Sequence, residues 1–444
     1  MEGLAKHSTH ATADRTNVPR GGGTAAVGFA VRRIHFKLCF LVNCIPHMVQ
    51  TGSLALHVNS LCYQRSPSTI SNHLSAASMN LRISAFFQHL PPYSGAAALR
   101  GQSIMARLPL LLPEAHIKVY CSSPNPLPIE GVTVIALQVP EVENSLGLFR
   151  RLMGEMRMGF VATRQMYFAR DRPDLAIVSS PGYISALVQT FFAQKRGIPY
   201  VLEMRDIYPQ VYAEALLLSS DSVLYRLFRL LSRRMYRGAS MVLCATQGLA
   251  REVISEESTS KVKYVYNGFP AQLAGRKAEK HQRFTVCFHG VLGFFQDVDT
   301  LLKVAKQLAP SDVDVLVIGY GRKEGPLQAC ELPNLRFLGR QPFEQTIAEI
   351  ERCHLGLCLR LDDKISKDAF PVKVWEYLGL GIPSIVTPPC EAGEFLQDHN
   401  CGVVLESGDV GGIVSAILKA KNAPLHLDHM SANCRRLAHS YTRE

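Results

Sequence analysis

Residues Asp368-Ala-Phe-Pro-Val-Lys-Val-Trp-Glu-Tyr-Leu-Gly-Leu-Gly-Ile-Pro383, followed by the apolar run Ser384-Ile-Val-Thr387, form the most informative stretch of the sequence. Pro371 suits the first turn of a helix, where its missing N–H is no loss, and Gly379 and Pro383 favour the end of that helix a few turns later. Lys373 lies one turn before Glu376, so the two side chains share a face of the helix. The stretch therefore predicts a short helix that leads directly into a strand.

The same alternation of helices and strands extends outward from this stretch in both directions. In the first half, the strand-like runs are 81–88, 116–121, 132–138, 174–179, 199–204, 240–245 and 262–266. In the second half they are 284–289, 313–319, 334–338, 354–360, 384–387 and 402–405. Strands separated by crossover-length helices specify parallel sheets with helices on both faces. The sequence therefore predicts two tandem, doubly wound, Rossmann-like α/β domains that face a cleft.

Breaks in this alternation mark the expected domain limits. We expect the first domain over residues 79–268 and the second over 284–426, with the polar and charged residues 271–283 as the linker. Residues 427–444 read as a C-terminal helix that either stays with the second domain or crosses back onto the first.

Residues 1–78 have no sustained hydrophobic period, and the character of the sequence changes at Met79. We expect either that Met79 is the true initiator or that the first 78 residues are disordered. A transit peptide is a third reading, because the segment is poor in acids and contains Arg and Ser.

Composition restricts the classes of protein. At 444 residues, with 47% hydrophobic and 19% charged content, the chain is long enough for two cores. No run approaches the roughly 20 apolar residues that a membrane span needs. The 12 cysteines include no C-x-x-C pair, a pattern that favours reduced thiols in the cytoplasm.

The net charge of +11 favours an anionic substrate or an anionic membrane surface, or is simply a cationic surface. No nucleic-acid motif accompanies the charge, so nucleic acid is not an expected partner. Two basic stretches, 150–172 and 226–237, alternate Arg with apolar residues. Either these helices rest on anionic lipid at the inner face of a membrane, or they are ordinary solvated faces of amphipathic helices.

A lysine beside a helix N-terminus is suited to a diphosphate, since the ammonium adds a full charge to the free N–H groups and the helix dipole. The carboxylate of Glu376, one turn after Lys373, can accept both hydroxyl protons of a ribose. The alternative is an ordinary surface Lys–Glu pair.

The segment Phe370-Pro-Val-Lys-Val-Trp-Glu-Tyr-Leu-Gly-Leu-Gly-Ile-Pro383 resembles the donor site of family 4 glycosyltransferases, with its pattern Phe-Pro-x-Lys-x-x-Glu-Tyr-Leu-x-x-Gly-x-Pro. In that family, two acids eight residues apart touch the transferred sugar and the donor ribose. Asp368 and Glu376 have that spacing, although the family's usual first acid is Glu. The resemblance covers most of residues 79–425 and implies the GT-B fold.

The resemblance also assigns donor-side residues at the start of the second domain. Phe288-His-Gly-Val-Leu-Gly-Phe-Phe-Gln-Asp-Val-Asp-Thr-Leu301 is similar to the family's first strand, glycine turn and helix, so Gly290 and Gly293 would let backbone approach the donor phosphates. Many relatives carry an Arg and a Lys in this turn, and this sequence has neither there. Lys373, helped by Arg322 or Lys323 from the turn after 313–319, would then supply the charge. The alternative for that second turn is a simple tight turn.

On the acceptor side, the resemblance points to two segments of the first domain. Ser94 and Gly95 lie in a glycine-containing loop after the first strand and would face the cleft. Glu203-Met-Arg-Asp-Ile-Tyr-Pro209 is similar to the family's Glu-x-Arg-Asp-x-x-Pro segment. Asp206 is expected to face the cleft there and to position the acceptor hydroxyl or stabilise positive charge at the sugar. Alternatively, Asp206 only caps the next helix.

The resemblance implies a hexosyltransferase that moves a sugar from a nucleotide-diphosphate donor to a glycan or lipid-linked acceptor in cell-surface polysaccharide synthesis. Asp206, Asp368 and Lys373 are the expected catalytic residues. Retention of configuration is expected, with no cofactor and no metal site, since no Asp-x-Asp motif lies in a plausible cleft position. The alternatives are a non-catalytic scaffold that binds nucleotide sugar, or a GT-B epimerase or phosphorylase.

Overall fold

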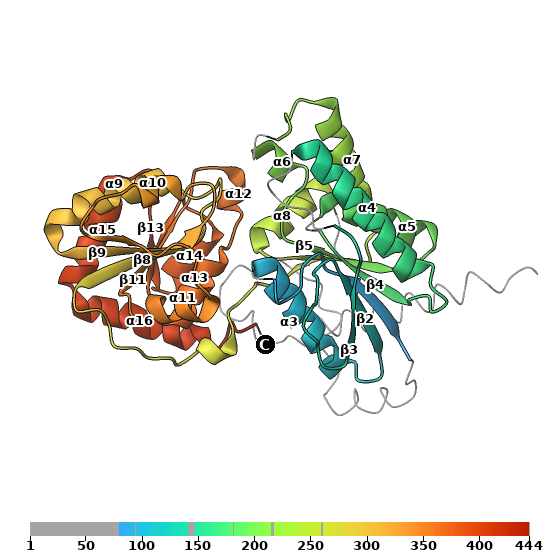
Figure 1. The fold of residues 1–444 in the computed structure, drawn as a ribbon, viewed down its shortest axis with the longest axis horizontal. Helices are drawn as coiled ribbons and strands as arrows, with labels where there is room; N and C mark the ends of the chain where they lie inside the picture. Colours follow the sequence, from blue (N-terminus) through green and yellow to red (C-terminus); the bar gives the residue numbers. More distant parts are fainter. Residues whose placement is uncertain are drawn as a thin grey trace, which may run out of the picture. The chain divides into compact units, whose positions relative to one another are not determined.

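The first domain is built on a sheet of seven parallel strands. The computed structural model describes residues 80–93, 95–140, 147–180, 182–214, 217–258 and 261–443. The strands are β1 (Arg82–Phe86), β2 (His116–Cys121), β3 (Val132–Ala136), β4 (Leu175–Ser179), β5 (Tyr200–Met204), β6 (Met241–Cys244) and β7 (Val262–Tyr264). They lie in the order β3-β2-β1-β4-β5-β6-β7 (Figure 1). The chain reverses its direction of strand addition between β1 and β4, as in a doubly wound fold.

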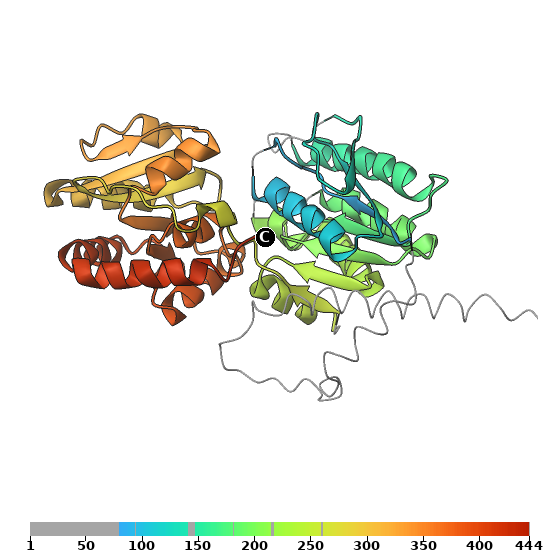
Figure 2. The same cartoon turned by 90° about the horizontal axis from the view of Figure 1, so that it is seen from below.

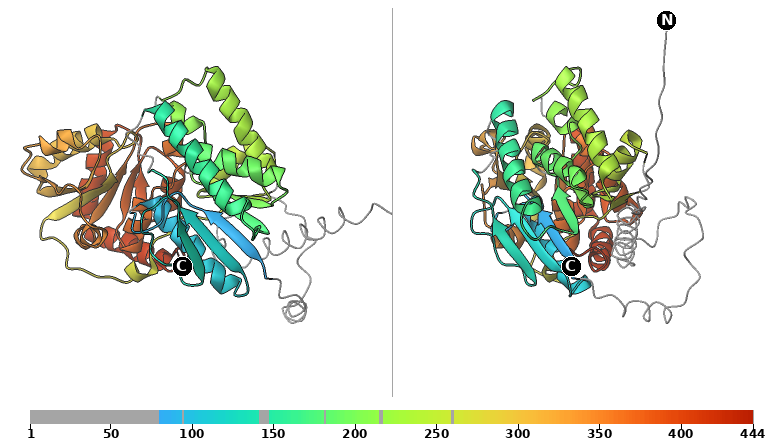
Figure 3. Two further views of the ribbon diagram at one scale, coloured as in Figure 1. Left: turned by 45° about the vertical axis from the view of Figure 1, so that its right-hand side comes forward. Right: turned by 90° about the vertical axis from the view of Figure 1, so that its right-hand side faces the viewer.

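Helices cover both faces of this first sheet. They are α3 (Ala96–Leu111), α4 (Leu148–Tyr167), α5 (Tyr183–Lys195), α6 (Gln210–Glu214), α7 (Val223–Gly238) and α8 (Gln247–Glu256). Helices α4, α5 and α7 pack side by side (Figures 1 and 3). Helix α4 approaches α5 closely at Gly159, where an added Cβ would lie 2.9 Å from the Cα of Ser185.

The second domain has a six-stranded parallel sheet. Its strands are β8 (Phe284–Val291), β9 (Val313–Tyr320), β10 (Leu335–Phe337), β11 (Leu355–Leu359), β12 (Ser384–Thr387) and β13 (Gly402–Val404). The order β10-β9-β8-β11-β12-β13 places the reversal between β8 and β11. In an open α/β sheet, ligands bind outside the carboxyl ends of the strands at this switch point.

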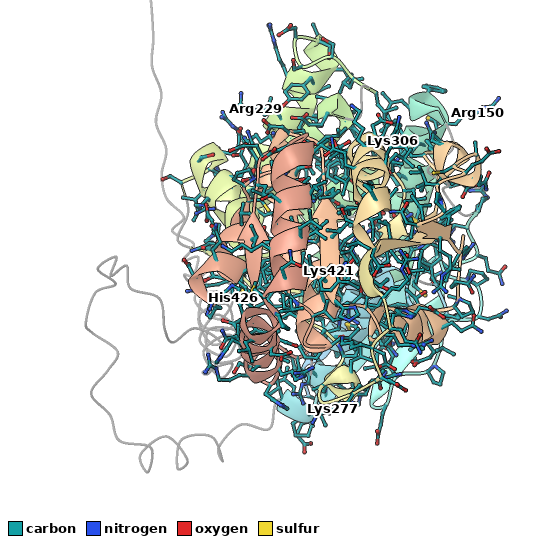
Figure 4. The ribbon with its side chains drawn as sticks, turned by 90° about the vertical axis from the view of Figure 1, so that its left-hand side faces the viewer. Arg150, Arg229, Lys277, Lys306, Lys421 and His426 are labelled. Carbon is teal, nitrogen blue, oxygen red and sulfur yellow. The ribbon has the colours of Figure 1, made fainter. Side chains whose placement is uncertain are left out.

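The described residues of the linker and the second domain also form eight α-helices and two short 3₁₀ segments. They are α9 (Val298–Leu308), α10 (Gly325–Gln328), α11 (Phe343–Ile350), α12 (Lys364–Lys367), α13 (Val372–Gly379), α14 (Glu391–Asp398), α15 (Val410–Asn422), α16 (Pro424–Ala438), η2 (Ala271–Leu273) and η3 (Ala309–Ser311). Helices α9 and α15, which carry the labelled Lys306 and Lys421, pack against each other (Figure 4). The Lys421 ammonium donates to the Ser311 carbonyl at 2.7 Å and so ties the end of α15 to η3.

The C-terminal helix lies with the second domain. Helix α16 packs on α13 and α15 and runs along that domain (Figure 2). The tail that follows reaches the end of the first domain's chain, where Phe269 accepts a hydrogen bond from the Arg443 N–H at 2.8 Å. The expected break at 271–283 is tied to the second domain, because Arg276 pairs with Glu351 at 2.8 Å. Residues 1–78 and their proposed role lie outside the described residues.

The doubly wound prediction is confirmed in both halves of the chain. Each predicted strand is present, within three residues of its expected limits at either end. The short runs are strands because they are buried on both faces, as in a parallel sheet covered by helices.

Candidate active site

The second sheet opens at its switch point. Strands β8 and β11 pair only at Leu355↔Val286 and Gly356↔Cys287, and they diverge towards their carboxyl ends. The hydroxyl of Tyr377 lies 3.2 Å from the Cys287 carbonyl and 3.3 Å from the Leu357 carbonyl. This one hydroxyl therefore anchors α13 across the opening between the two strands.

Helix α13 forms where the sequence predicts it. Pro371 is its N-cap residue, and the chain leaves the helix through Gly381, whose φ of 70° suits glycine. Lys373 and Glu376 are each only 7% exposed, although both side chains are ionisable. Buried ionisable groups are rare unless they are paired or functional, so this helix is the centre of the candidate site.

The ammonium of Lys373 lies in a nearly apolar environment. It donates to the Gln296 Oε1 at 2.9 Å and lies 4.0 Å from the centroid of the Phe288 ring. Burial, together with the nearby charge of Arg360, lowers the pKa of Lys373 to about 8, while Cys358 and Glu376 oppose the shift. Such a cation is suited to an anionic ligand, which would relieve its desolvation.

The carboxylate of Glu376 has the opposite shift for the same reason. Burial raises its pKa to about 7, while the positive charges of Arg443 and Lys373 act against the shift. The Nε2 of His289, at the end of β8, lies 3.4 Å from the Glu376 Oε2 and has no hydrogen-bond partner within the described chain. Burial also lowers the pKa of His289 well below its usual value, so this imidazole is neutral at pH 7.

The glycine turn after β8 leaves room above Lys373. Gly290 has a φ of 116°, and a Cβ there would lie 3.6 Å from the Lys373 Cε. At Gly293, an added Cβ would have no heavy atom within 4 Å. Of the two cations expected to help Lys373, Lys323 donates to the carbonyls of Phe294 and Gln296 at 3.2 and 2.7 Å.

Arg322, the other expected helper, is exposed, with its guanidinium 5.0 Å from the centroid of the Phe294 ring. Lys323 instead fixes the shape of the glycine turn through its hydrogen bonds to the carbonyls of Phe294 and Gln296. Donor contacts of Arg322 and Lys323 therefore stay predictions.

A separate pocket of about 280 Å³ brings together two of the predicted acids, and residues of both α/β domains line it. Asp206 and Asp368 are both among the lining residues. Burial raises the pKa of each carboxyl above its usual value; near Asp206 the charges of Arg205 and Arg360 oppose that shift. The backbone carbonyl of Asp368 accepts a hydrogen bond from the Thr246 hydroxyl at 2.9 Å.

The other predicted acceptor-side residues have different positions. Ser94 lies outside the described residues, and Gly95 is the exposed N-cap residue of α3, with a φ of 149°. Glu203, three residues before Asp206, forms a buried ion pair with Arg100 at 2.6 Å. Arg100 also donates to the side chain of Asn267, so this network holds the Glu203–Pro209 segment in place.

Three residues near the site were not singled out from the sequence. His289 and Gln296 lie inside the glycine-turn segment, and each contacts a side chain of α13. Arg360 follows β11 and is buried. An arginine at the carboxyl end of an apolar strand is a signal that sequence reasoning could have used for Arg360, because ligands of such sheets gather there.

The two basic stretches carry both paired and exposed arginines. Arg229 and Arg233 pair with Glu256, and Arg237 pairs with Glu257, so much of the charge on α7 is matched by α8. Arg150 and Arg229 are exposed on the first domain (Figure 4). Helix α7 also exposes apolar side chains, namely those of Val223, Leu224, Leu227 and Leu230.

Two tandem doubly wound domains, the second with a buried lysine and carboxylate at its switch point, define a protein of the GT-B class. A family model described as a glycosyl transferase 4-like domain matches residues 96–268, and one described as glycosyl transferases group 1 matches residues 272–437. Together the two models span most of the chain, which therefore belongs to these glycosyltransferase families and is a glycosyltransferase.

Solved structures share the fold at low sequence identity. The Anabaena protein HepE, in complex with UDP-glucose, is 17% identical with a TM-score of 0.59, covering 82% of this chain and 96% of HepE. Sucrose-phosphate synthase from Thermosynechococcus elongatus is 13% identical with a TM-score of 0.61, covering 81% of this chain and 94% of the synthase.

WaaG, a glycosyltransferase involved in lipopolysaccharide biosynthesis, is 14% identical with a TM-score of 0.57, covering 80% of this chain and 95% of WaaG. A comparison with curated protein sequences found no match. Within the described ranges, no helix is both long and apolar enough to cross a membrane.

Proposed function

We propose that this chain transfers a hexose from a nucleotide-diphosphate sugar to a glycan or lipid-linked acceptor in cell-surface polysaccharide synthesis. The observation that carries the proposal is the burial of Lys373 and Glu376 side by side, under a glycine turn, at the switch point of the second sheet. A cation for the diphosphate and a carboxylate for the ribose are what such a donor requires. The fold likeness to HepE, a protein solved with UDP-glucose, supports this choice of donor.

In this proposal the donor lies along the amino end of α13. The Lys373 ammonium and the free N–H groups at the start of the helix receive the diphosphate, and Glu376 accepts hydrogen bonds from the ribose hydroxyls. Gly290 and Gly293 let the backbone approach the phosphates, because a side chain at either position would take up that space.

Transfer breaks the bond between the anomeric carbon and the β-phosphate oxygen, and the bonding electron pair leaves with the diphosphate. The acceptor oxygen forms the new bond on the same face of the sugar, and its proton passes to the departing diphosphate, so configuration is retained. Protein cations stabilise the charge on the leaving group in place of a metal ion. We therefore expect transfer to continue unchanged in the presence of EDTA.

The acceptor is proposed to bind on the first-domain side, with Asp206 and Asp368 acting at the pocket that they line. A carboxylate there can position the acceptor hydroxyl or stabilise positive charge on the sugar. The exposed leucines and arginines of α7 support a peripheral contact with anionic lipid at the inner membrane face, where a lipid-linked acceptor would be found.

The test uses the purified full chain. A thermal-shift panel of UDP-, GDP-, ADP- and TDP-sugars identifies the donor, since a selective ligand raises the melting temperature by mass action. Donor hydrolysis and transfer are then measured in Lys373→Ala, Glu376→Ala and the exposed control Lys303→Ala. We expect the first two variants to lose activity while they stay folded, and the control to retain it. Activity that survives both changes would refute this site, and donor binding without any transfer would indicate a scaffold.

A further inference from the structure

Arg360 lies at the carboxyl end of β11 and is held rigidly by its backbone. Its N–H donates to the Thr387 carbonyl at 3.1 Å, and its carbonyl accepts from the Ser407 hydroxyl at 2.9 Å. It also pairs with Gln296 in an isolated antiparallel bridge. The side chain is only 8% exposed, so a fixed backbone projects a guanidinium into a largely buried position.

This buried guanidinium has no counterion within 4 Å among the described residues. Its Nε has no hydrogen-bond partner in that part of the chain, and its Cζ lies 5.8 Å from the centroid of the Phe295 ring. A largely buried charge without an opposite charge beside it is costly, because little replaces the hydration that it has lost. A protein that keeps such a group commonly uses it to bind an anion.

A second buried cation lies beside Arg360. The segment around Gln296 touches both groups, since Gln296 pairs with the Arg360 backbone and its side chain accepts from the Lys373 ammonium. The charge of Arg360 also lowers the pKa of Lys373, as expected of like charges held close together. The two positive charges repel each other, and an anion bound to both would offset that repulsion.

The geometry points to Arg360 as a ligand of the donor diphosphate, which it holds together with Lys373 at the carboxyl ends of β8 and β11. This inference rests on the proposed function and names a residue for its leaving-group site. An arginine donates through a planar fork that matches phosphate oxygens, whereas the lysine contributes a point charge. The glycine turn after β8 lacks an arginine and a lysine, and β11 supplies the second charge from the opposite side of the switch point.

Asp206 offers the competing explanation. Burial raises the pKa of Asp206 and the charge of Arg360 opposes that rise, so the competing role for the guanidinium is that of a long-range counterion for this carboxyl. The two roles differ in what the removal of Arg360 does. A phosphate ligand affects only ligands that carry phosphate, whereas a counterion affects the stability of the ligand-free protein.

The experiment compares nucleotides that differ only in phosphate. Isothermal titration calorimetry ranks UDP, GDP, ADP and TDP on the wild-type chain, and the tightest is then compared with its nucleoside and its monophosphate. The variants are Arg360→Met, which removes the charge at similar length, Arg360→Lys, which keeps it, and the control Arg336→Met. Arg336 lies in the same domain but is exposed and paired with Glu349.

We expect Arg360→Met to weaken the diphosphate by about 10- to 100-fold, the loss of one or two charge-assisted hydrogen bonds, with nucleoside affinity unchanged. Arg360→Lys should recover part of the loss, and Arg336→Met should match the wild type. The melting temperature of ligand-free Arg360→Met should equal or exceed that of the wild type, which also shows that the variant folds.

Equal diphosphate affinity in Arg360→Met and the wild type overturns the inference and leaves the proposed function intact. A lower melting temperature of the ligand-free variant, with an unchanged preference for diphosphate over nucleoside, would assign the counterion role instead. If none of the four diphosphates binds the wild-type chain, the proposed function fails together with this inference.

Discussion

At the scale of single residues, burial brings the pKa values of Lys373 and Glu376 close together. The pKa of Lys373 falls to about 8 and the pKa of Glu376 rises to about 7, because each group loses hydration of its charged form. The donor proposal needs both groups charged, the ammonium for phosphate and the carboxylate for ribose. The fraction of molecules in which both groups are charged is therefore largest at a pH between the two pKa values.

The kcat/KM for the donor should therefore be bell-shaped in pH, with its maximum between about 7 and 8. Activity falls on the acidic side as Glu376 takes up a proton, and on the basic side as Lys373 loses one. Steady-state kinetics from pH 5 to 10 check the profile. In Glu376→Gln the residual activity should lack the acidic limb, and a flat wild-type profile would contradict the assignment.

His289 gives a second prediction at this scale. The Nε2 of its neutral imidazole lies 3.4 Å from the Glu376 Oε2, and both residues are buried. His289→Ala should raise the KM for the donor by about tenfold with little change in kcat, because the buried carboxylate of Glu376 loses its polar neighbour. The acidic limb should also move to higher pH, because the carboxylate form of Glu376 loses support.

His289→Gln keeps an N–H donor and should restore part of the donor affinity. A packing role would instead lower the melting temperature of both variants and leave the acidic limb where it is. The position of that limb in the pH profile is therefore the measurement that separates the two roles.

At the scale of elements, alternation in the sequence predicts the strands well because each is a short apolar run between polar turns. The run 313–319 becomes β9 (Val313–Tyr320), for example. What local sequence does not contain is the order of the strands and the opening between β8 and β11, which depend on how helices pack across the sheet. Helix α13 is the element that occupies this opening.

The position of α13 depends on a glycine in the neighbouring strand. A Cβ on Gly356 would lie 2.5 Å from the Tyr377 ring, so Gly356→Ala should push α13 away from the opening. We expect a loss of about 1–3 kcal/mol in the free energy of unfolding, typical of an overpacked core, and weaker donor binding. Denaturant unfolding and calorimetry measure the two effects.

The matched control for this change is Gly325→Ala, because an added Cβ at Gly325 has no heavy atom within 4 Å. It should alter neither quantity. If Gly356→Ala binds donor as the wild type does, the placement of α13 against β11 does not govern the site.

At the scale of the whole molecule, a carboxylate of the second domain holds a helix of the first. Glu391, the first residue of α14, accepts hydrogen bonds from the N–H groups of Gln247 and Gly248 at the start of α8. It also accepts from the Tyr266 hydroxyl at 2.6 Å. The two α/β domains belong to one compact unit, and these hydrogen bonds connect α14 of the second domain to residues of the first.

This contact marks the limit of prediction from the sequence. The spacing of Lys373 and Glu376 suggests a shared helix face, because both positions lie on one continuous helix. Glu391, Arg360 and His289 acquire their roles only from residues far away in the chain, such as Gln247 for Glu391 at a separation of 144 positions. Folding brings these groups together through packing that no local pattern encodes.

The last prediction follows from the same contact. The first N–H groups of α8 donate to Glu391 instead of to a carbonyl of their own helix. Glu391→Gln should therefore speed amide hydrogen exchange at Gln247 and Gly248 by about 10- to 100-fold, because each N–H loses a charge-assisted hydrogen bond. Nucleotide affinity should stay within about twofold, because Lys373 and Glu376 lie in the second domain, while kcat falls with the weaker contact between the domains. Glu394→Gln, an exposed acid in the same first turn of α14, is the control for both measurements. Exchange at wild-type rates in Glu391→Gln would show that the start of α8 does not rely on this carboxylate.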